Sequence, residues 1–304
     1  MDKIKSLVEA RREFDTQEKC EAYLEGKRWP DGVTCPRCSS KDVTYMESRR
    51  QWQCECRYQF SVTAGTVFHR THIDLPRWLM AVWLMCYSPK GISGKQIQRE
   101  LGVTYKTAWY MAKRIRKAMK HDIFDDKLCG IVEVDASAVK ADGATGRFGT
   151  QNVLGMAERY GALRMVVIDR LTTENIERVC LGNFDRVEMI YSDAANSMHF
   201  LSEIAEHRTV AHYFEHAHGQ THTNYVENAW SLFKRGLIGV FHHVSAKCLQ
   251  EYLDEFAFRC SHRKERAGLV DLVLANCEGK WMRRWLSAVD LKPSREFRCF
   301  VFGP

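Results

Sequence analysis

Four cysteines crowded into 22 residues constrain this chain more than any other feature of its sequence. Cys35 and Cys38 form one pair, Cys54 and Cys56 form a second, and 15 residues separate the pairs. Two cysteine pairs at about this distance are typical of a zinc ribbon, in which two tight turns supply four thiolates to one tetrahedral Zn²⁺. We therefore expect a structural Zn²⁺, whose binding energy of ~10–16 kcal/mol contributes to folding.

The second cysteine pair departs from the usual ribbon spacing. A single residue separates Cys54 from Cys56, where ribbons usually have two. His69 and His72 follow nearby and are possible substitute ligands. The alternative is four reduced cysteines without a metal. The other eight of the chain's twelve cysteines are scattered singly, as buried apolar residues are.

The longest apolar run indicates a buried helix and not a membrane span. It covers residues 78–87, ten residues, whereas a helix needs about 20 to cross a bilayer. The first residues also lack the apolar segment of a signal peptide. We expect a cytoplasmic protein with no membrane partner, in which cysteines serve as thiols or metal ligands.

Charge is divided unevenly between the two halves of the chain. Residues 1–128 hold 24 Lys and Arg against 16 Asp and Glu, a balance of +8, whereas residues 129–304 hold 21 against 22. A basic front half indicates a module that binds a polyanion such as nucleic acid. The alternative is that a few units of charge only keep the protein soluble.

The pattern of apolar residues changes near the polar connection 121–128, where we place the main boundary. Beyond it, strands are expected at 130–135, 153–157, 163–168 and 187–193, and helices at 173–181, 196–206 and 224–235. These alternations predict an α/β domain, a mixed sheet covered by helices. The predicted domains are a helical lead-in (1–30), the ribbon (31–68), a helical DNA-binding domain (72–120), a catalytic domain (129–265) and a helical tail (266–304).

Residues 93–109 fit a helix-turn-helix. Ile97 and Leu101 share a helix face, Gly102 suits the turn and Thr104 can cap the second helix. The residues predicted to contact DNA are Lys106 and Thr107 in the major groove, and Lys113, Arg114, Arg116 and Lys117 at phosphates. The alternative is an ordinary helical hairpin with a solvated basic face.

Three carboxylates stand where two strands and a helix could bring them together. Asp135 and Asp193 each end a predicted strand, and Glu227 lies in an amphipathic helix with Lys234 two turns further on. Such carboxylates can hold two Mg²⁺ or Mn²⁺ ions for phosphodiester displacement, with Lys234 meeting a phosphate. The alternative is isolated structural acids. Reserve candidates are Asp142, Asp169 and Glu133.

These motifs together resemble one family over roughly residues 15–265. The stretches that carry the resemblance are Cys35-Pro-Arg-Cys38, residues 58–68 and 91–109, Val134-Asp135, Ser192-Asp193, His222-x-Asn224-x-x-Glu227-x-x-Trp230, and residues 234–243 and 252–259. The chain is similar to bacterial insertion-sequence transposases of the DDE type with an N-terminal zinc ribbon, the ISXO2-like group related to Merlin transposases.

The resemblance implies an RNase H-like catalytic domain that acts on double-stranded DNA. Its substrate would be the terminal inverted repeats of a transposon, whose 3′ ends are cut and joined to target DNA. Asp135, Asp193 and Glu227 would be the metal ligands, and the front domains would grip the ends. We expect a homo-oligomer on DNA.

Two other functions are compatible with the sequence. A transcriptional regulator could use the ribbon and helix-turn-helix without catalysis, and it would need no acids at 135, 193 and 227. A nuclease on the same fold would cleave and not join. The sequence assigns no role to the tail after residue 268, with Trp281 and Trp285; the simplest expectation is a helix that packs on the catalytic domain.

Overall fold

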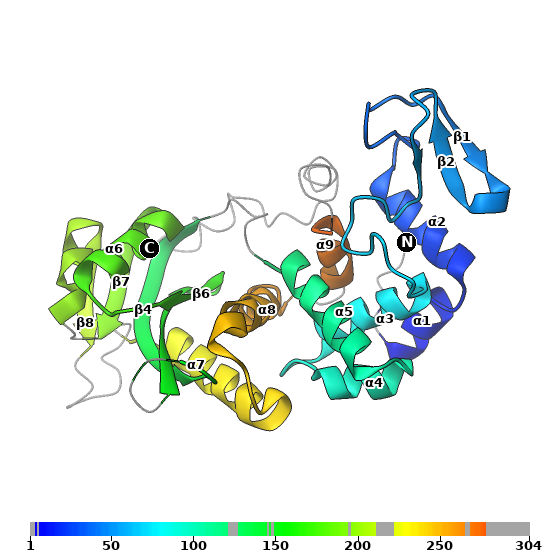
Figure 1. The fold of residues 1–304 in the computed structure, drawn as a ribbon. Helices are drawn as coiled ribbons and strands as arrows, with labels where there is room; N and C mark the ends of the chain where they lie inside the picture. Colours follow the sequence, from blue (N-terminus) through cyan, green and yellow to red (C-terminus); the bar gives the residue numbers. More distant parts are fainter. Residues whose placement is uncertain are drawn as a thin grey trace. The chain divides into compact units, whose positions relative to one another are not determined.

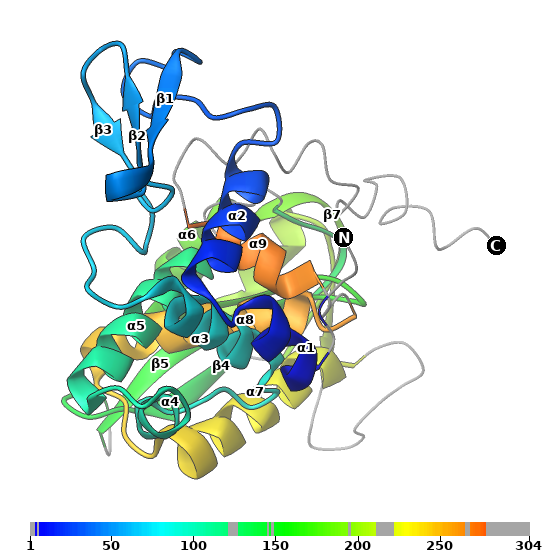
Figure 2. The same ribbon diagram turned by 90° about the vertical axis from the view of Figure 1, so that its right-hand side faces the viewer.

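The computed structural model describes residues 4, 6–120, 127–144, 146, 149–193, 196–210, 222–264 and 268–277. They form two compact units (Figures 1 and 2). Unit 1 holds the described parts of residues 1–88, 92–119 and 264–292, and unit 2 holds those of 89–91 and 120–263. Among the described residues, no helix is long and apolar enough to cross a membrane.

Unit 1 begins with two capped helices and a small sheet. Ser6 and Thr16 cap α1 (Leu7–Glu13) and α2 (Gln17–Arg28) with their side-chain oxygens. The antiparallel sheet comprises β1 (Val43–Met46), β2 (Gln51–Cys54) and β3 (Gln59–Phe60), with the 3₁₀ turn η1 (Glu47–Arg49) between the first two. It is attached to α2, because the Trp52 indole donates to Glu25 at 2.9 Å and Phe60 packs edge-on against Trp29.

Three further helices complete the centre of unit 1: α3 (Leu75–Tyr87), α4 (Gly94–Leu101) and α5 (Tyr105–Ala118). The apolar run predicted as a buried helix is α3, with Pro76 in its first turn and Trp78 fully buried. Gly102 adopts φ +62° at the end of α4, a left-handed conformation that glycine tolerates best. The Thr104 hydroxyl then accepts from the Thr107 amide and caps α5.

The end of the described chain returns to unit 1, contrary to the expectation that the tail packs on the catalytic domain. In α9 (Leu269–Ala275), Asp271 accepts a 2.6 Å hydrogen bond from the Tyr23 hydroxyl and pairs with Lys27 at 3.0 Å. The Val67 amide donates to the carbonyl of Cys277. All seven residues of α9 except Asp271 are buried, which explains its apolar composition. Trp281 and Trp285 lie outside the described residues.

Unit 2 is built on a mixed sheet whose described strands run in the order β6-β5-β4-β7-β8. The strands are β4 (Leu128–Lys140), β5 (Thr150–Glu158), β6 (Leu163–Ile168), β7 (Phe184–Asp193) and β8 (Glu206–Val210). β4, β5 and β6 are antiparallel neighbours, while β7 pairs in parallel with both β4 and β8. This confirms the predicted mixed α/β sheet.

Helices cover both faces of this sheet (Figure 1). One face packs against α6 (Thr173–Asn183) and the 3₁₀ segment η4 (Asn196–Glu203), the other against α7 (Asn224–Gly236) and α8 (Leu249–Ser261). The short segments η5 (Leu237–Phe241) and η6 (Ala246–Cys248) join these last two helices. The helix expected at 196–206 is thus a 3₁₀ segment followed by β8, a strand that was not predicted.

Gly155 allows α7 to lie directly on the sheet. A Cβ atom at this position would come within 2.7 Å of the Trp230 ring and 2.8 Å of Val226, both on α7. Gly155 is also the cross-strand partner of Asp135. The bare backbone at Gly155 therefore brings the helix that carries Glu227 next to the strand that carries Asp135.

Candidate functional site

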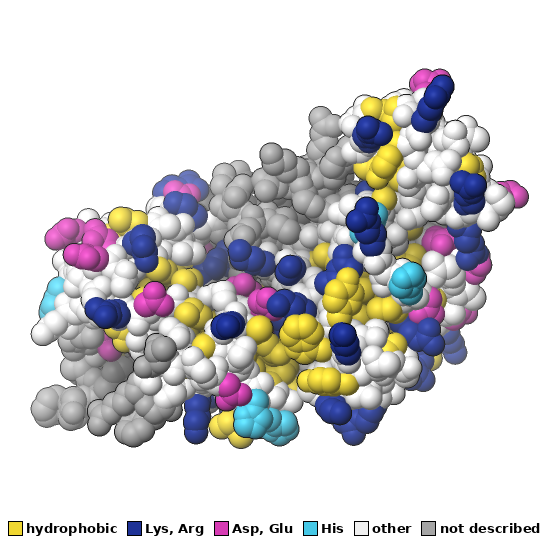
Figure 3. All heavy atoms as spheres, viewed as in Figure 1, with side chains coloured by type: hydrophobic (Ala, Val, Ile, Leu, Met, Phe, Trp, Pro, Cys, Tyr) yellow, Lys and Arg dark blue, Asp and Glu magenta, His cyan; other side chains and the backbone are white. Residues whose placement is uncertain are grey.

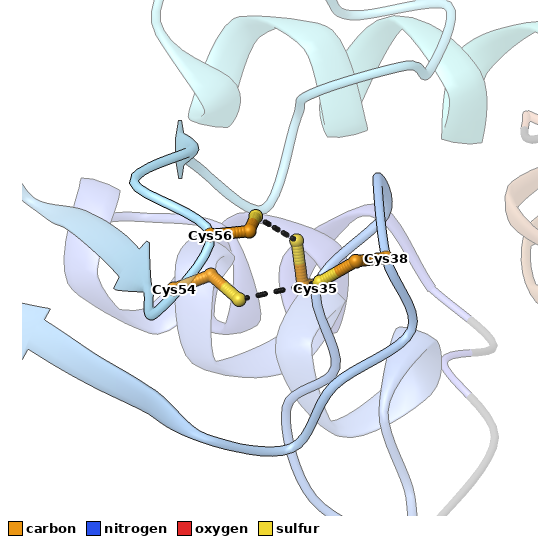
Figure 4. Close-up of side chains that lie close together, drawn as sticks. All are labelled: Cys35, Cys38, Cys54 and Cys56. Carbon is orange, nitrogen blue, oxygen red and sulfur yellow. Dashed lines mark hydrogen bonds between the residues drawn. The ribbon is translucent and has the colours of Figure 1, made fainter.

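The four cysteines meet at the base of the small sheet (Figure 4). Their sulfur atoms all lie within 4.8 Å of one another, with Cys35 and Cys56 3.8 Å apart and Cys38 and Cys54 3.4 Å apart. Tetrahedral Zn–S bonds of 2.3 Å place sulfur atoms about 3.8 Å apart, so the quartet fits Zn²⁺. The short spacing of the second pair does not prevent Cys56 from joining, and no histidine is needed.

Backbone hydrogen bonds lower the pKa of the Cys35 thiol. Burial raises the pKa of Cys35, but hydrogen bonds from the backbones of Cys38 and Arg37 outweigh it, and the pKa falls to about 7. The Arg37 amide lies 3.4 Å from this sulfur. Because the thiolate is the ligand form, a lowered pKa favours coordination near neutral pH.

Asp135 and Asp193 lie side by side on parallel strands. Asp193 ends β7 as predicted, whereas Asp135 lies in the middle of β4, which continues to Lys140 beyond the predicted strand end because it pairs with β5 there. The last registered pair between β4 and β7 is Val134 with Ser192, so each acid is the next residue on its strand. Neighbouring residues in register point to the same face of a sheet. That face is the one covered by α7, because Asp135 pairs with Gly155 beneath Trp230.

Helix α7 is held along β4 at both of its ends. The Glu133 carboxylate accepts hydrogen bonds from the backbone amides of Tyr225 and Val226 at 2.7 and 3.2 Å. Near the other end, the Lys234 ammonium donates to the Ser137 hydroxyl at 2.7 Å. Alternate residues of β4 thus meet successive turns of α7, and Asp135 lies between the two contacts.

Glu227 is oriented by the residue that precedes its helix. Thr223, at the N-cap position, makes no capping bond with its side chain. Its hydroxyl instead donates to the Glu227 carboxylate at 2.5 Å. The first turn of α7 therefore presents a carboxylate whose position is set by a buried threonine.

The three carboxyl groups interact electrostatically. Burial, assisted by the charges of Asp193 and Glu227, raises the pKa of Asp135 to about 6, although a hydrogen bond from the Ala136 amide opposes the shift. Such mutual repulsion is relieved by a divalent cation, and carboxylate oxygens are the ligands that Mg²⁺ and Mn²⁺ prefer. The donor set therefore fits these metals.

The carboxyl oxygens stand farther apart than the cysteine sulfurs. Within the described ranges, the cysteine quartet is the one group of three or more possible ligands whose atoms lie within 4.8 Å of one another. The reserve candidates lie elsewhere or are already bonded: Asp142 and Asp169 are exposed, and Glu133 is fully buried among donors.

The residues predicted to contact DNA have different surroundings along α5. Lys106 and Lys117 are exposed, whereas Thr107 and Lys113 are half-buried. Arg116 is only 3% exposed and so does not belong to the basic surface. Arg114 is half-buried and donates to the His69 carbonyl at 3.0 Å and to the Tyr110 hydroxyl at 2.5 Å, which gives it a structural role.

Aromatic side chains interrupt this basic surface. Tyr105, Trp109 and Tyr110 are 39–45% exposed, and Lys113 lies 5.2 Å from the centre of the Trp109 ring. Figure 3 shows hydrophobic side chains among Lys and Arg over α5. These three aromatic residues were not among the predicted DNA contacts, although their basic neighbours on the second helix were a signal for them. Rings of this kind can contact bases as well as pack in a core.

Comparisons with known proteins agree with this arrangement. Residues 125–261 match the ISXO2-like transposase domain, and residues 15–59 match the transposase zinc-ribbon domain. A protein of the transposable element ISH50 from Halobacterium salinarum, described as uncharacterized, is 28% identical over 274 residues, which cover 81% of this chain and 91% of that protein.

Two solved structures of viral proteins show weaker likeness. The catalytic core of BIV integrase matches with a TM-score of 0.30 and 13% identity over 44% of this chain and 84% of that chain. A simian T-cell lymphotropic virus intasome in complex with PP2A regulatory subunit B56 gamma matches with a TM-score of 0.26 and 16% identity, over 44% of this chain and 53% of that one.

We expect the purified protein to carry about one Zn²⁺ per chain, and Cys56→Ser to lose most of it, because three thiolates hold the ion less tightly than four. Metal analysis by atomic emission and thermal unfolding measure the two effects. Cys248→Ser, at a half-buried cysteine of unit 2, is the control. Zinc content unchanged in Cys56→Ser would show that Cys56 is not a ligand.

We expect Asp135→Asn to stabilise the protein in the absence of divalent metal at pH 7.5. Folding raises the pKa of Asp135 from 3.8 to about 6, so its ionisation costs stability progressively as the pH rises through this range. The variant avoids that cost, roughly 1–3 kcal/mol. The gain should disappear near pH 4, where the acid is largely protonated in the folded protein.

Thermal unfolding of the zinc-loaded protein at pH 4–8, without added Mg²⁺ or Mn²⁺, measures this difference, with the exposed Asp169→Asn as control. A stability difference between Asp135→Asn and the parent that does not change with pH would contradict the shifted pKa.

Proposed function

Since the chain belongs to the insertion-sequence transposases that join a zinc ribbon to an ISXO2-like DDE domain, we propose that it cuts the terminal inverted repeats of its element and joins the 3′ ends to target DNA. The family makes it a DNA transposase and a polynucleotidyl transferase. The observation that carries the active-site assignment is the electrostatic coupling of Asp135 with Asp193 and Glu227 on one face of the sheet. A regulator without catalysis would not need this costly arrangement.

The three carboxylates are the proposed metal ligands. Mg²⁺ or Mn²⁺ bound there supplies activation of the attacking oxygen and stabilisation of the leaving oxygen at phosphorus. Lys234, already directed toward β4 by its bond to Ser137, is proposed to contact a phosphate of the DNA. Hydrolysis and strand joining are the same displacement with water or a 3′-hydroxyl as nucleophile, so one site serves both.

We propose that unit 1 binds double-stranded DNA. The capped turn between α4 and α5 supports a helix-turn-helix, with Lys106 and Thr107 at the start of the reading helix. The exposed Lys117 and the half-buried Lys113 are proposed phosphate contacts. Both ends of an element must be cut, so the proposed active form is a homo-oligomer assembled on DNA.

We expect Asp193→Asn to abolish cleavage and joining while DNA binding is retained, because the change keeps the side chain's shape and removes a ligand charge. Lys234→Ala should reduce the rate less, since it contacts substrate and not metal. Strand cleavage and joining on duplexes with the inverted repeat measure activity, and a gel-shift titration measures binding. Asp169→Asn is the matched control, and parental rates in Asp193→Asn would overturn the assignment.

We expect the double variant Lys113→Ala, Lys117→Ala, which removes two proposed phosphate contacts, to bind DNA with a weaker dependence on salt. Each lost phosphate contact lowers the slope of log affinity against log salt concentration by about 0.9. Fluorescence anisotropy between 50 and 300 mM salt measures the slope. Lys19→Ala, an exposed lysine of α2, is the control, and an unchanged slope would place the DNA surface elsewhere.

A further inference from the structure

We propose that Glu133 is a positioning residue for the active site: it seats the first turn of α7 so that Glu227 can share a divalent cation with Asp135 and Asp193. The inference rests on the proposed function of these three acids. It assigns Glu133, Arg159 and Thr223 a joint task that follows from their contacts.

Glu133 is fully buried and both of its oxygens are bonded. One accepts from the Arg159 guanidinium at 3.0 Å and lies 3.2 Å from a ring nitrogen of His222. The other accepts from the amides of Tyr225 and Val226. A carboxylate with four such neighbours is not available as a metal ligand. In this respect Glu133 differs from Asp135, two residues later on the same face of the strand.

The capping of α7 is divided between two residues in an unusual way. Helix N-termini leave amides without partners inside the helix, and a side chain at the N-cap usually accepts from one of them. Here the N-cap Thr223 uses its hydroxyl to hold Glu227, and Glu133 from β4 accepts from the amides instead. A negative charge at this end of a helix is also favoured by the helix dipole.

By capping α7, Glu133 connects β4, which carries Asp135, directly to the helix that carries Glu227. Val226 and Glu227 are consecutive, with a rise of about 1.5 Å per residue, so a shift of the helix terminus displaces Glu227 by a similar amount. Glu133 and Asp135 point to the same face of β4, because side chains alternate along a strand. Glu133 therefore fixes the position of Glu227 on α7 relative to β4.

Arg159 connects Glu133 to β7, the strand that carries Asp193. It is nearly buried, follows β5, and donates to the His222 carbonyl at 3.0 Å just before α7. Its guanidinium also lies 4.2 Å from the centre of the Tyr191 ring on β7, two residues before Asp193. The Glu133–Arg159 pair thus contacts β4, β7 and the start of α7, the three elements that carry the proposed ligands.

A buried ion pair could serve stability alone, so the test must separate stability from positioning. Unit 2 contains a matched pair in α8, where Glu255 is fully buried and bonded to Arg259. Removing the Glu255 charge leaves an equally buried arginine uncompensated. Both residues lie on α8, one turn apart, and the Arg259 guanidinium donates to the Glu255 carboxylate.

The experiment measures Mn²⁺ binding to the zinc-loaded protein by calorimetry, without DNA, for the parent, Glu133→Gln and Glu255→Gln. The Asp193→Asn variant gives the background at other sites. Removing a group that orients a metal ligand typically costs 10–100-fold in affinity, so we expect that loss in Glu133→Gln. We expect Glu255→Gln to bind Mn²⁺ as the parent does, although both variants unfold at lower temperature.

A second readout follows strand cleavage as Mn²⁺ is varied. The concentration for half-maximal cleavage should rise 10–100-fold in Glu133→Gln, with cleavage partly restored at high Mn²⁺ and DNA affinity unchanged. If Glu133→Gln is poorly folded, the double variant Glu133→Gln, Arg159→Gln removes both charges and leaves no buried charge unbalanced, and the same loss is expected.

Parental Mn²⁺ affinity in a folded Glu133 variant would overturn the inference and leave the proposed function intact. An equal loss in Glu255→Gln would also overturn it, because the effect would then follow stability. A parent protein that binds no Mn²⁺ would overturn both the proposed metal site and the inference.

Discussion

The active-site arrangement depends on the parallel pairing of β4 with β7, because its register brings two acids together where that pairing ends. Val134 lies beside Ser192, so Asp135 and Asp193 follow side by side on the face that α7 covers. Burial and the neighbouring charges then raise the pKa of Asp135, a cost to the fold that a cation can offset. The sheet, Gly155 and the seating of α7 all act to bring a third carboxylate to this pair.

Much of this arrangement could be predicted from local patterns. Strand-length apolar runs ending in Asp135 and Asp193, and the spacing of Val226, Trp230 and Phe233 on α7, depend on residues close in sequence. The cysteine cluster could be predicted for the same reason, since four thiolates in 22 residues have few other uses. The turn from α4 to α5 follows directly from Gly102 and Thr104, whose conformational preferences are strong.

The remainder depends on partners distant in sequence. Glu133 was only a reserve ligand in the sequence, because nothing local shows that Arg159 and the amides of α7 occupy its oxygens. Arg116 shares a basic run with exposed residues, and only the packing of α5 buries it. The strand β8 is short and polar, and α9 is apolar enough to suit either unit, so neither has a periodicity that reveals its neighbours.

The return of α9 to unit 1 has a consequence for synthesis on the ribosome. Tyr23 and Lys27 are made early, but their partner Asp271 is made after the whole of unit 2. Domains usually fold as they emerge, N-terminal ones first. Here the earlier unit lacks part of its core until the later one has been translated. The nascent chain would therefore complete unit 2 before unit 1 closes.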